Sequence, residues 1–246
     1  YVQPLKALGA TVILEVQPPL RTLLQQLDGA DRVLTKDMPP PAFDFQCPLM
    51  SLPLAMGTMP DTVPQPGAYL RSDTNRARAW QDRLGPRRQP RIGLVWSGSP
   101  KHKGDQQRSI VLADLLSLLG PGFEFVSLQK ELREADAEVL RAQPQIRHFG
   151  EALGDFSDTA ALCELMDLVI SVDTSVAHLA GAMGRPVWIL LPFIPDWRWL
   201  LDRQDSPWYS SARLFRQARP GDWSGVIERV KTELAAGRFR KTDLPA

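Results

Sequence analysis

Six short apolar runs in the second part of the chain alternate with helical patterns, and this alternation most strongly limits the folds open to it. The strand-like runs cover residues 91–96, 123–128, 146–149, 168–172, 187–191 and 213–216. Helical patterns lie at about 110–119, 130–142, 158–166 and 175–183, with a last one near 223–236. Continuous apolar strands of this kind are typical of parallel strands covered by helices on both faces. The pattern therefore predicts a doubly wound α/β sheet, in which ligands bind beyond the carboxyl ends of the strands.

The first 84 residues predict a smaller unit with the same rhythm. A helix end stopped by Gly9 is followed by the strand-like run "TVILEV", a helix that opens on proline, and the strand-like run "DRVL". Residues 39–66 hold eight of the 22 prolines, so they predict loops rather than one regular element. Two roles stay open for this stretch: a linker with a docked apolar patch, or a segment that faces a ligand.

A domain boundary is predicted after a helix at roughly 74–84. The sequence "LGPRRQP" combines glycine, proline and charge at that point, as linkers between domains do. We therefore expect an N-terminal domain over residues 1–84 and a C-terminal domain over residues 85–246. The chain starts within a predicted helix, so we also expect it to be a fragment whose natural start lies upstream.

Composition excludes several functional classes. The formal net charge is only +1, without a basic stripe, which argues against a nucleic-acid or membrane-surface binder. No apolar run approaches the length of a transmembrane helix, and no signal peptide is visible. Cys47 and Cys163 both lie in apolar surroundings, so we expect buried free thiols in a reducing compartment, the cytoplasm.

Polar residues follow two of the predicted strands and suit an anionic ligand. The loop "SGSPKHKGDQQRS" after residues 91–96 combines small residues, whose backbone N–H groups can approach an anion, with several cations. It has neither the P-loop spacing nor a G-x-G-x-x-G motif, so it indicates a phosphate or pyrophosphate site of another kind, or simply a solvated loop. Gln129 and Lys130 follow the next strand, at the same edge of the predicted sheet.

A third strand ends in Asp173, Thr174 and Ser175, with His178 in the following helical turn. All three of the first residues favour helix N-caps, so an ordinary capped helix explains them without a ligand. An open helix N-terminus at a strand end also favours anion binding. A hydrolase triad has little support, because no G-x-S-x-G motif is present and the three side chains lie within one turn.

Metal chemistry has little support either. There is no D-x-D pair, no H-E-x-x-H motif and no cysteine cluster. Glu134, Asp136 and Glu138 lie on a helix with charges all round, so we expect them to form a solvated face.

The long aromatic stretch "PFIPDWRWLLDRQDSPWY" is too rich in aromatic residues for a simple connection, and we expect it either to close over a ligand or to pack on the first domain.

Together these stretches resemble the family 9-type glycosyltransferases, relatives of the lipopolysaccharide heptosyltransferases. The segment from "DLVISVDTSVAHLAGAMGRPVWILLP" through "RLFRQ" carries the resemblance most strongly, and "RIGLVWSGSPKHKGDQQRSI" and "FVSLQK" match in order. The likeness also includes "LKALGATVILEVQPPLRTLL" and "FDFQCPLMSLPLAMGT". The likeness covers nearly the whole chain and is greatest to bacterial members that carry upstream tetratricopeptide repeats. It is specific for the family and unspecific for the substrate.

The resemblance implies a GT-B architecture, in which two Rossmann-like domains face each other across a cleft. The N-terminal domain, incomplete here, would lie on the acceptor side, and the C-terminal domain would hold a nucleoside-diphosphate-sugar. The donor-binding residues that it implies are Ser97, Gly98, Lys101 and Arg108 at the diphosphate, Asp173, Thr174, Ser175 and His178 at the phosphate and donor sugar, and Gln129 and Lys130 toward the nucleoside. Such enzymes need no metal and no further cofactor.

One departure from the family concerns catalysis. The resemblance implies that the first strand and its Gly-rich loop, which carries or supports the acidic catalytic base, would precede the helix with which this chain starts. No acid in the sequence can be assigned as the general base by motif, so we expect this fragment to lack it. The leading hypothesis is transfer of a sugar to a glycan, lipid-linked or protein acceptor. The alternatives are a non-catalytic nucleotide-sugar-binding or protein-interaction module and, with less support, a sugar-nucleotide epimerase.

Overall fold

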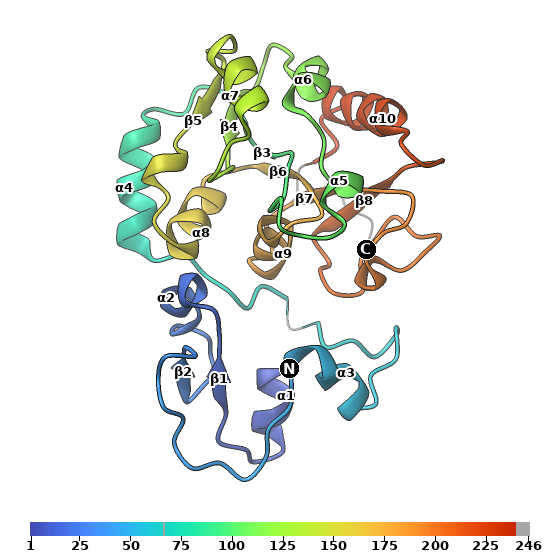
Figure 1. Cartoon of the computed structure of the whole chain (residues 1–246). Coiled ribbons are helices and arrows are strands. Elements are labelled where there is room, and N and C mark those ends of the chain that lie inside the picture. The colour runs from blue at the N-terminus through green and yellow to red at the C-terminus, as the bar shows by residue number, and fades with distance from the viewer. Residues whose placement is uncertain (66, 240–246) are drawn as a thin grey trace.

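The computed structural model consists of a large α/β lobe and a smaller lobe beneath it (Figure 1). It describes residues 1–65 and 67–239. Residue 66 of the predicted loop-rich stretch and residues 240–246 of the predicted C-terminal domain lie outside this part. Together with the sheet described next, the two lobes confirm the predicted GT-B-like α/β architecture.

The large lobe is built on one six-stranded sheet in the order β5-β4-β3-β6-β7-β8, and every neighbouring pair is parallel. The strands are β3 (Arg91–Val95), β4 (Glu124–Ser127), β5 (Ile146–His148), β6 (Leu168–Val172), β7 (Val187–Leu191) and β8 (Ala212–Arg216). All six correspond to predicted runs. Because the chain moves outward from β3 in both directions, the switch point of this doubly wound sheet lies between β3 and β6.

Helices cover both faces of this sheet, as the apolar strands predict. They are α4 (Thr74–Leu84), α5 (Asp105–Arg108), α6 (Leu112–Leu115), α7 (Glu134–Arg141), α8 (Phe156–Glu164), α9 (Ser175–Ala182) and α10 (Trp223–Ala235). One core layer joins strand residues such as Val95 and Val169 to α4, α8 and α9. The other joins Ile92 and Leu94 to α6 and α10. Alternate residues of each strand therefore enter opposite core layers, so both faces are buried.

The small lobe contains a two-stranded parallel sheet and short helices. Its elements are α1 (Val2–Ala7), β1 (Ile13–Glu15), α2 (Arg21–Leu24), β2 (Arg32–Leu34) and α3 (Leu52–Ala55), with 3-10 turns at Pro18–Leu20 and Leu49–Ser51. Leu14, Val16 and Val33 form its small core. In its described residues, 39–65, the proline-rich stretch is loop apart from α3 and one 3-10 turn, as predicted, and Phe45 within it is 94% exposed.

Helix α4 packs on the large lobe, although the predicted boundary assigns it to the first domain. Trp80 and Leu84 enter the core layer of α8 and α9, and Arg76 forms an ion pair of 2.7 Å with Asp158 of α8. Leu23 of α2 reaches the same core layer, which ties the small lobe to α8. The division at residues 84 and 85 stays a prediction.

Two expectations about burial are wrong. Cys163 is a buried free thiol, but Cys47 is exposed, because the loop around it does not fold into a core. Asp136 is only 2% exposed rather than part of a solvated face: its carboxylate accepts hydrogen bonds from Trp96 Nε1 at 3.0 Å and from the Leu112 amide at 2.8 Å. Among the described residues, no helix is long and apolar enough to cross a bilayer.

Candidate functional site at the switch point of the sheet

The loops after β3 and β6 meet at the switch point between these strands. The guanidinium Nη1 of Arg108, at the end of the first loop, donates to the backbone carbonyl of Asp173 at 2.8 Å. This bond joins two segments that lie 65 residues apart in the sequence. The structure thus brings together two of the three predicted anion-binding stretches at the carboxyl ends of neighbouring strands.

Hydrogen bonds within the first loop fix its path. The Gly98 amide donates to Ser109 Oγ at 3.1 Å, and Ser109 Oγ donates to the Asp105 carboxylate at 2.8 Å. A Cβ atom at Gly98 would lie 2.5 Å from Nη2 of Arg108, so only glycine lets the guanidinium lie against the loop backbone. Lys101 is exposed in the same loop. Sequence reasoning did not identify Asp105 and Ser109 as site residues, because no motif in "DQQRS" predicts these hydrogen bonds.

Gln129 and Lys130 are engaged within the protein. The buried amide of Gln129 donates to the Ser97 carbonyl at 2.8 Å and lies 3.1 Å from Ser97 Oγ, which ties the loop after β4 to the loop after β3. Lys130 Nζ donates to the Gly154 carbonyl at 2.6 Å. Gly154 belongs to the segment that leads into α8. Gln129 and Ser97 therefore serve first to hold the strand-end loops together.

Helix α9 begins without a side-chain cap. Thr174 occupies the N-cap position, but its hydroxyl lies 3.1 Å from Ser171 Oγ instead of accepting from an amide of the helix. Ser175 is exposed at the first helical position, and the carboxylate of Asp173 is largely buried beside His178. The ordinary capping interpretation of these residues is therefore wrong. The free amides of the first turn, and the positive end of the helix dipole, remain available to an anion.

His178 is held in an aromatic setting. Its Nδ1 is hydrogen-bonded to the Tyr209 hydroxyl at 3.0 Å, its ring stacks on Trp199 with 5.0 Å between ring centroids, and its Nε2 lies 3.7 Å from Asp173 Oδ1. Burial lowers the pKa of His178, against the opposing pull of the Asp173 carboxylate. Burial likewise raises the pKa of Tyr209, so its phenol keeps its proton. The imidazole is therefore neutral near pH 7.

The aromatic stretch after β7 is partly exposed, but some of its residues pack on other parts of the protein. Trp199 is fully buried against His178, and the carbonyl of Pro207 accepts a hydrogen bond from the Gln65 amide. Arg198 contacts the sulfur of Met50 in the loop-rich stretch. The expected packing on the first part of the chain is thus confirmed, while closure over a ligand stays a prediction. Trp199 and Tyr209 could have been suspected only from the aromatic richness of this stretch.

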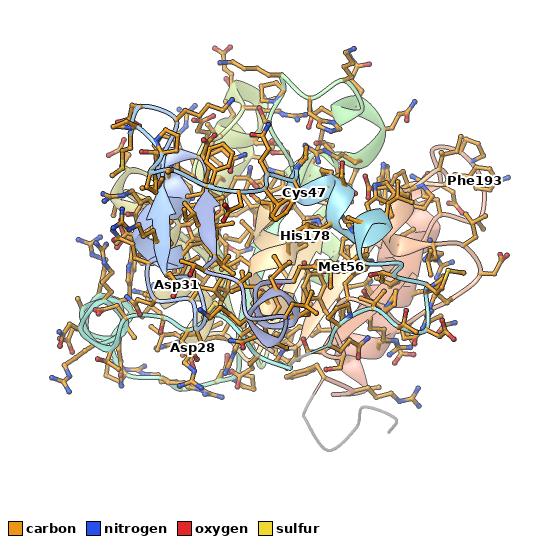
Figure 2. The ribbon with its side chains drawn as sticks, turned by 90° about the horizontal axis from the view of Figure 1, so that it is seen from below. Asp28, Asp31, Cys47, Met56, His178 and Phe193 are labelled. Atoms are coloured by element: carbon orange, nitrogen blue, oxygen red, sulfur yellow. The ribbon has the colours of Figure 1, made fainter. Side chains whose placement is uncertain are left out.

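The small lobe lies over the same side of the large lobe as α9. Figure 1 shows α9 on the side of the large lobe nearest the small lobe, and the backbone amides of Tyr69 and Leu70 both donate to the Ala182 carbonyl of α9. Figure 2, seen from below, shows His178 near the middle of the molecule, between the β1–β2 pair and α3.

In the described residues, no three His, Cys, Asp or Glu side chains gather in a way that could hold a metal ion.

A six-stranded parallel sheet with a basic strand-end site, next to a smaller α/β lobe, is the GT-B-like class of fold. Within this fold, residues 151–190 match the model of Glycosyltransferase family 9 (heptosyltransferase), which confirms the predicted resemblance to family 9-type glycosyltransferases. The greater likeness to members with upstream tetratricopeptide repeats stays a prediction. The matched segment includes β6, α9 and most of β7, and with them Asp173 and His178.

Two particular proteins are similar to this chain. Protein FlbA of Caulobacter vibrioides is 30% identical over 203 residues, which cover 78% of this chain and 33% of FlbA. The chain therefore spans about a third of the length of this curated relative. The solved structure of E. coli ADP-heptose lps heptosyltransferase II superposes with a TM-score of 0.60 at 15% identity, covering 96% of this chain and 92% of that one. This second likeness shows the fold.

Proposed function

We propose that this chain is the donor-binding part of a metal-independent glycosyltransferase. It would transfer a sugar from a nucleoside-diphosphate-sugar to a hydroxyl of a glycan, lipid-linked or protein acceptor. The observation that carries the proposal is the junction of the loop after β3 with the uncapped start of α9, fixed by the bond between Arg108 and Asp173. The family match over residues 151–190 supports it, because that match includes one side of this junction.

The chemistry that these residues offer suits a departing diphosphate. When the bond from the anomeric carbon to the diphosphate oxygen breaks, negative charge grows on the β-phosphate. The α9 amides, Arg108 and Lys101 would stabilise that charge electrostatically, without a metal ion. The neutral imidazole of His178 can exchange hydrogen bonds with sugar hydroxyls from its Nε2 side.

The loop-rich stretch of the small lobe gives the acceptor side of this proposal. Leu49, Met50 and Leu54 are exposed there, and Arg198 of the aromatic stretch contacts Met50. An acceptor that reaches the donor sugar would pass beside these residues. We propose that this stretch faces a ligand, which is one of its two predicted roles.

A non-catalytic module with the same fold is the second candidate. It would bind the nucleotide-sugar through the same junction but would not break the sugar–phosphate bond. The exposed apolar side chains of the loop-rich stretch favour this reading as far as partner binding is concerned, since such patches often mark interaction sites.

Product analysis separates the candidates. The full-length protein is incubated with ADP-, UDP-, GDP- and CMP-sugars, with and without a cell lysate that supplies acceptors, and with and without EDTA. Free nucleotide, bound nucleotide-sugar and the identity of the sugar are measured. The glycosyltransferase proposal expects acceptor-dependent nucleotide release that EDTA does not reduce. Binding without release supports the module, and sugar interconversion without acceptor supports the epimerase. Release that EDTA abolishes contradicts metal independence.

A further inference from the structure

Two arginines from different strand-end loops share one buried carboxylate next to the junction. Asp105 is only 5% exposed, and its Oδ2 is paired with Nη2 of Arg133, which precedes α7. Its Oδ1 lies 3.8 Å from Nε of Arg108. Ser109 Oγ bridges the group, since it donates to Asp105 and lies 3.2 Å from Arg133 Nη2. Two guanidinium groups around one carboxylate leave a formal charge of +1 at this point.

Both guanidinium groups keep unused donors. Within the described part of the chain, Nε of Arg108 and Nε of Arg133 are buried and have no hydrogen-bond partner. A buried N–H without a partner is unfavourable, so a guanidinium group that carries such a donor favours an incoming acceptor. The side chain of Arg133 is 36% exposed, so a solute can reach it.

The position of the pair connects it with the switch point. The Arg108 guanidinium lies against Gly98 and donates to the Asp173 carbonyl, so it stands between the loop after β3 and the start of α9. Arg133 comes from the loop after β4 and contacts Asp105 and Ser109, whose Oγ also accepts from the Gly98 amide. Guanidinium groups bind phosphate oxygens in pairs of parallel hydrogen bonds, which gives them both strength and orientation.

We infer that Arg133 is a further ligand-binding residue, which with Arg108 grips the diphosphate of a nucleotide, and that Asp105 is the positioning residue that holds both. This inference rests on the proposed function, since it concerns the same site. It adds Arg133 of the loop after β4, a residue that neither the sequence motifs nor the family match over residues 151–190 includes. The competing account is that Asp105 and Arg133 only hold the loops together.

Calorimetric titration of the full chain tests the role of Arg133. The probes are inorganic pyrophosphate, the diphosphates ADP, UDP, GDP and CDP, and the matching nucleosides. The variant Arg133→Gln is compared with Arg141→Gln, which removes an exposed arginine from the other end of α7. We expect Arg133→Gln to weaken pyrophosphate and the bound diphosphate about tenfold or more, the effect of losing one charge-assisted hydrogen bond. Arg141→Gln should bind as the wild type does.

Asp105→Asn tests the positioning role. It keeps the shape of the side chain and removes the charge that aligns the two guanidinium groups. We expect a smaller ratio of diphosphate to nucleoside affinity, with nucleoside affinity unchanged, and partial recovery in Asp105→Glu. Because Asp105 is buried, thermal unfolding is followed for each variant, and titrations are run well below the lowest midpoint so that all proteins are folded.

The outcomes separate this inference from the proposed function. Equal diphosphate affinity in Arg133→Gln and Arg141→Gln overturns the inference, as does an equal loss of nucleoside and diphosphate affinity, which would point to a structural role. Failure of the wild type to bind pyrophosphate or any diphosphate overturns it too. If the diphosphate is lost selectively in Arg133→Gln but no nucleotide-sugar is ever consumed, the inference stands and the glycosyltransferase proposal fails.

Discussion

At the scale of single residues, the candidate site depends on contacts between positions far apart in the sequence. His178 could be identified from its place after a strand end, but its hydrogen bond to Tyr209 spans 31 residues and its stacking partner Trp199 lies in the next loop. The pair of Arg133 and Asp105 spans 28 residues. Motif reasoning finds residues that are close in sequence, and these partners are close only after the sheet has formed.

The neutral state of His178 gives a pH-dependent stability. An unfolded histidine takes up a proton near pH 6.5, whereas burial lowers the pKa of folded His178. Below pH 6.5 the unfolded state therefore binds more protons, and the free energy of unfolding falls as the pH drops from 6.5 toward the lowered folded pKa. We expect His178→Asn to flatten this dependence. Urea unfolding from about pH 8 to about pH 5.5 measures it.

His148 contributes equally to the pH dependence of the wild type and of His178→Asn. Burial lowers the pKa of His148 as well, so it contributes a loss of stability on acidification in both proteins. A dependence on pH that is equally steep in the wild type and in His178→Asn would mean that His178 is not held neutral by its setting.

Gly181, in the last turn of α9, is expected to reject alanine. Alanine normally stabilises a helix relative to glycine by about 0.5–1 kcal/mol. Here a Cβ atom would lie 2.4 Å from Cγ of Tyr209, so the ring that holds His178 would have to move. We expect Gly181→Ala to lower the free energy of unfolding by about 1–3 kcal/mol, as overpacking does. Gly104→Ala, whose Cβ would meet only His102 at 3.5 Å, should be nearly neutral in the same urea titration. A stabilised Gly181→Ala would contradict the packing.

At the scale of elements, the strands follow the sequence closely because both of their faces are buried. The predicted run at 168–172 coincides with β6, and the run at 187–191 with β7. Helix starts are less regular, because local hydrogen bonds decide them. Helix α8 begins earlier than its apolar pattern, since the Asp155 carboxylate caps it by accepting from the Ser157 amide at 2.8 Å. Helix α7 begins later, since Arg133 before it has extended backbone.

The docking of α4 on the large lobe can be measured through Trp80. This side chain is buried, meets Phe149 edge-on with 5.7 Å between ring centroids and lies under Arg83. We expect Trp80→Ala to cost about 3–5 kcal/mol of unfolding free energy, the usual effect of emptying a core tryptophan site. Trp197→Ala, in which a 49% exposed ring is removed, should cost less than about 1 kcal/mol. Similar small losses in both variants would show that α4 is not part of the core.

At the scale of the whole molecule, the doubly wound sheet and its site edge follow from the order of apolar runs. The contact between lobes does not, because it depends on loop conformations that proline-rich sequence leaves undetermined. The apolar residues around Cys47 predict burial, yet Cys47 is exposed. Asp136 lies on a helix with charges all round, yet it is buried and accepts hydrogen bonds from Trp96 and from the amide of Leu112. Local composition indicates which residues can be buried, and topology decides which of them are.

The central claim, that the open start of α9 binds a diphosphate, is tested most directly by changing charge at Ser175. This residue is exposed at the first helical position. An aspartate there stabilises the helix by about 0.3–1 kcal/mol through its interaction with the helix dipole, but it repels an anionic ligand. Calorimetric titration with ADP-, UDP- and GDP-sugars compares the wild type, Ser175→Asp and its neutral isostere Ser175→Asn. The account expects one nucleotide-sugar to bind both the wild type and Ser175→Asn, and to bind Ser175→Asp at least about tenfold more weakly although that variant is no less stable. Equal affinity of Ser175→Asp and Ser175→Asn, or no binding by the wild type, would contradict it.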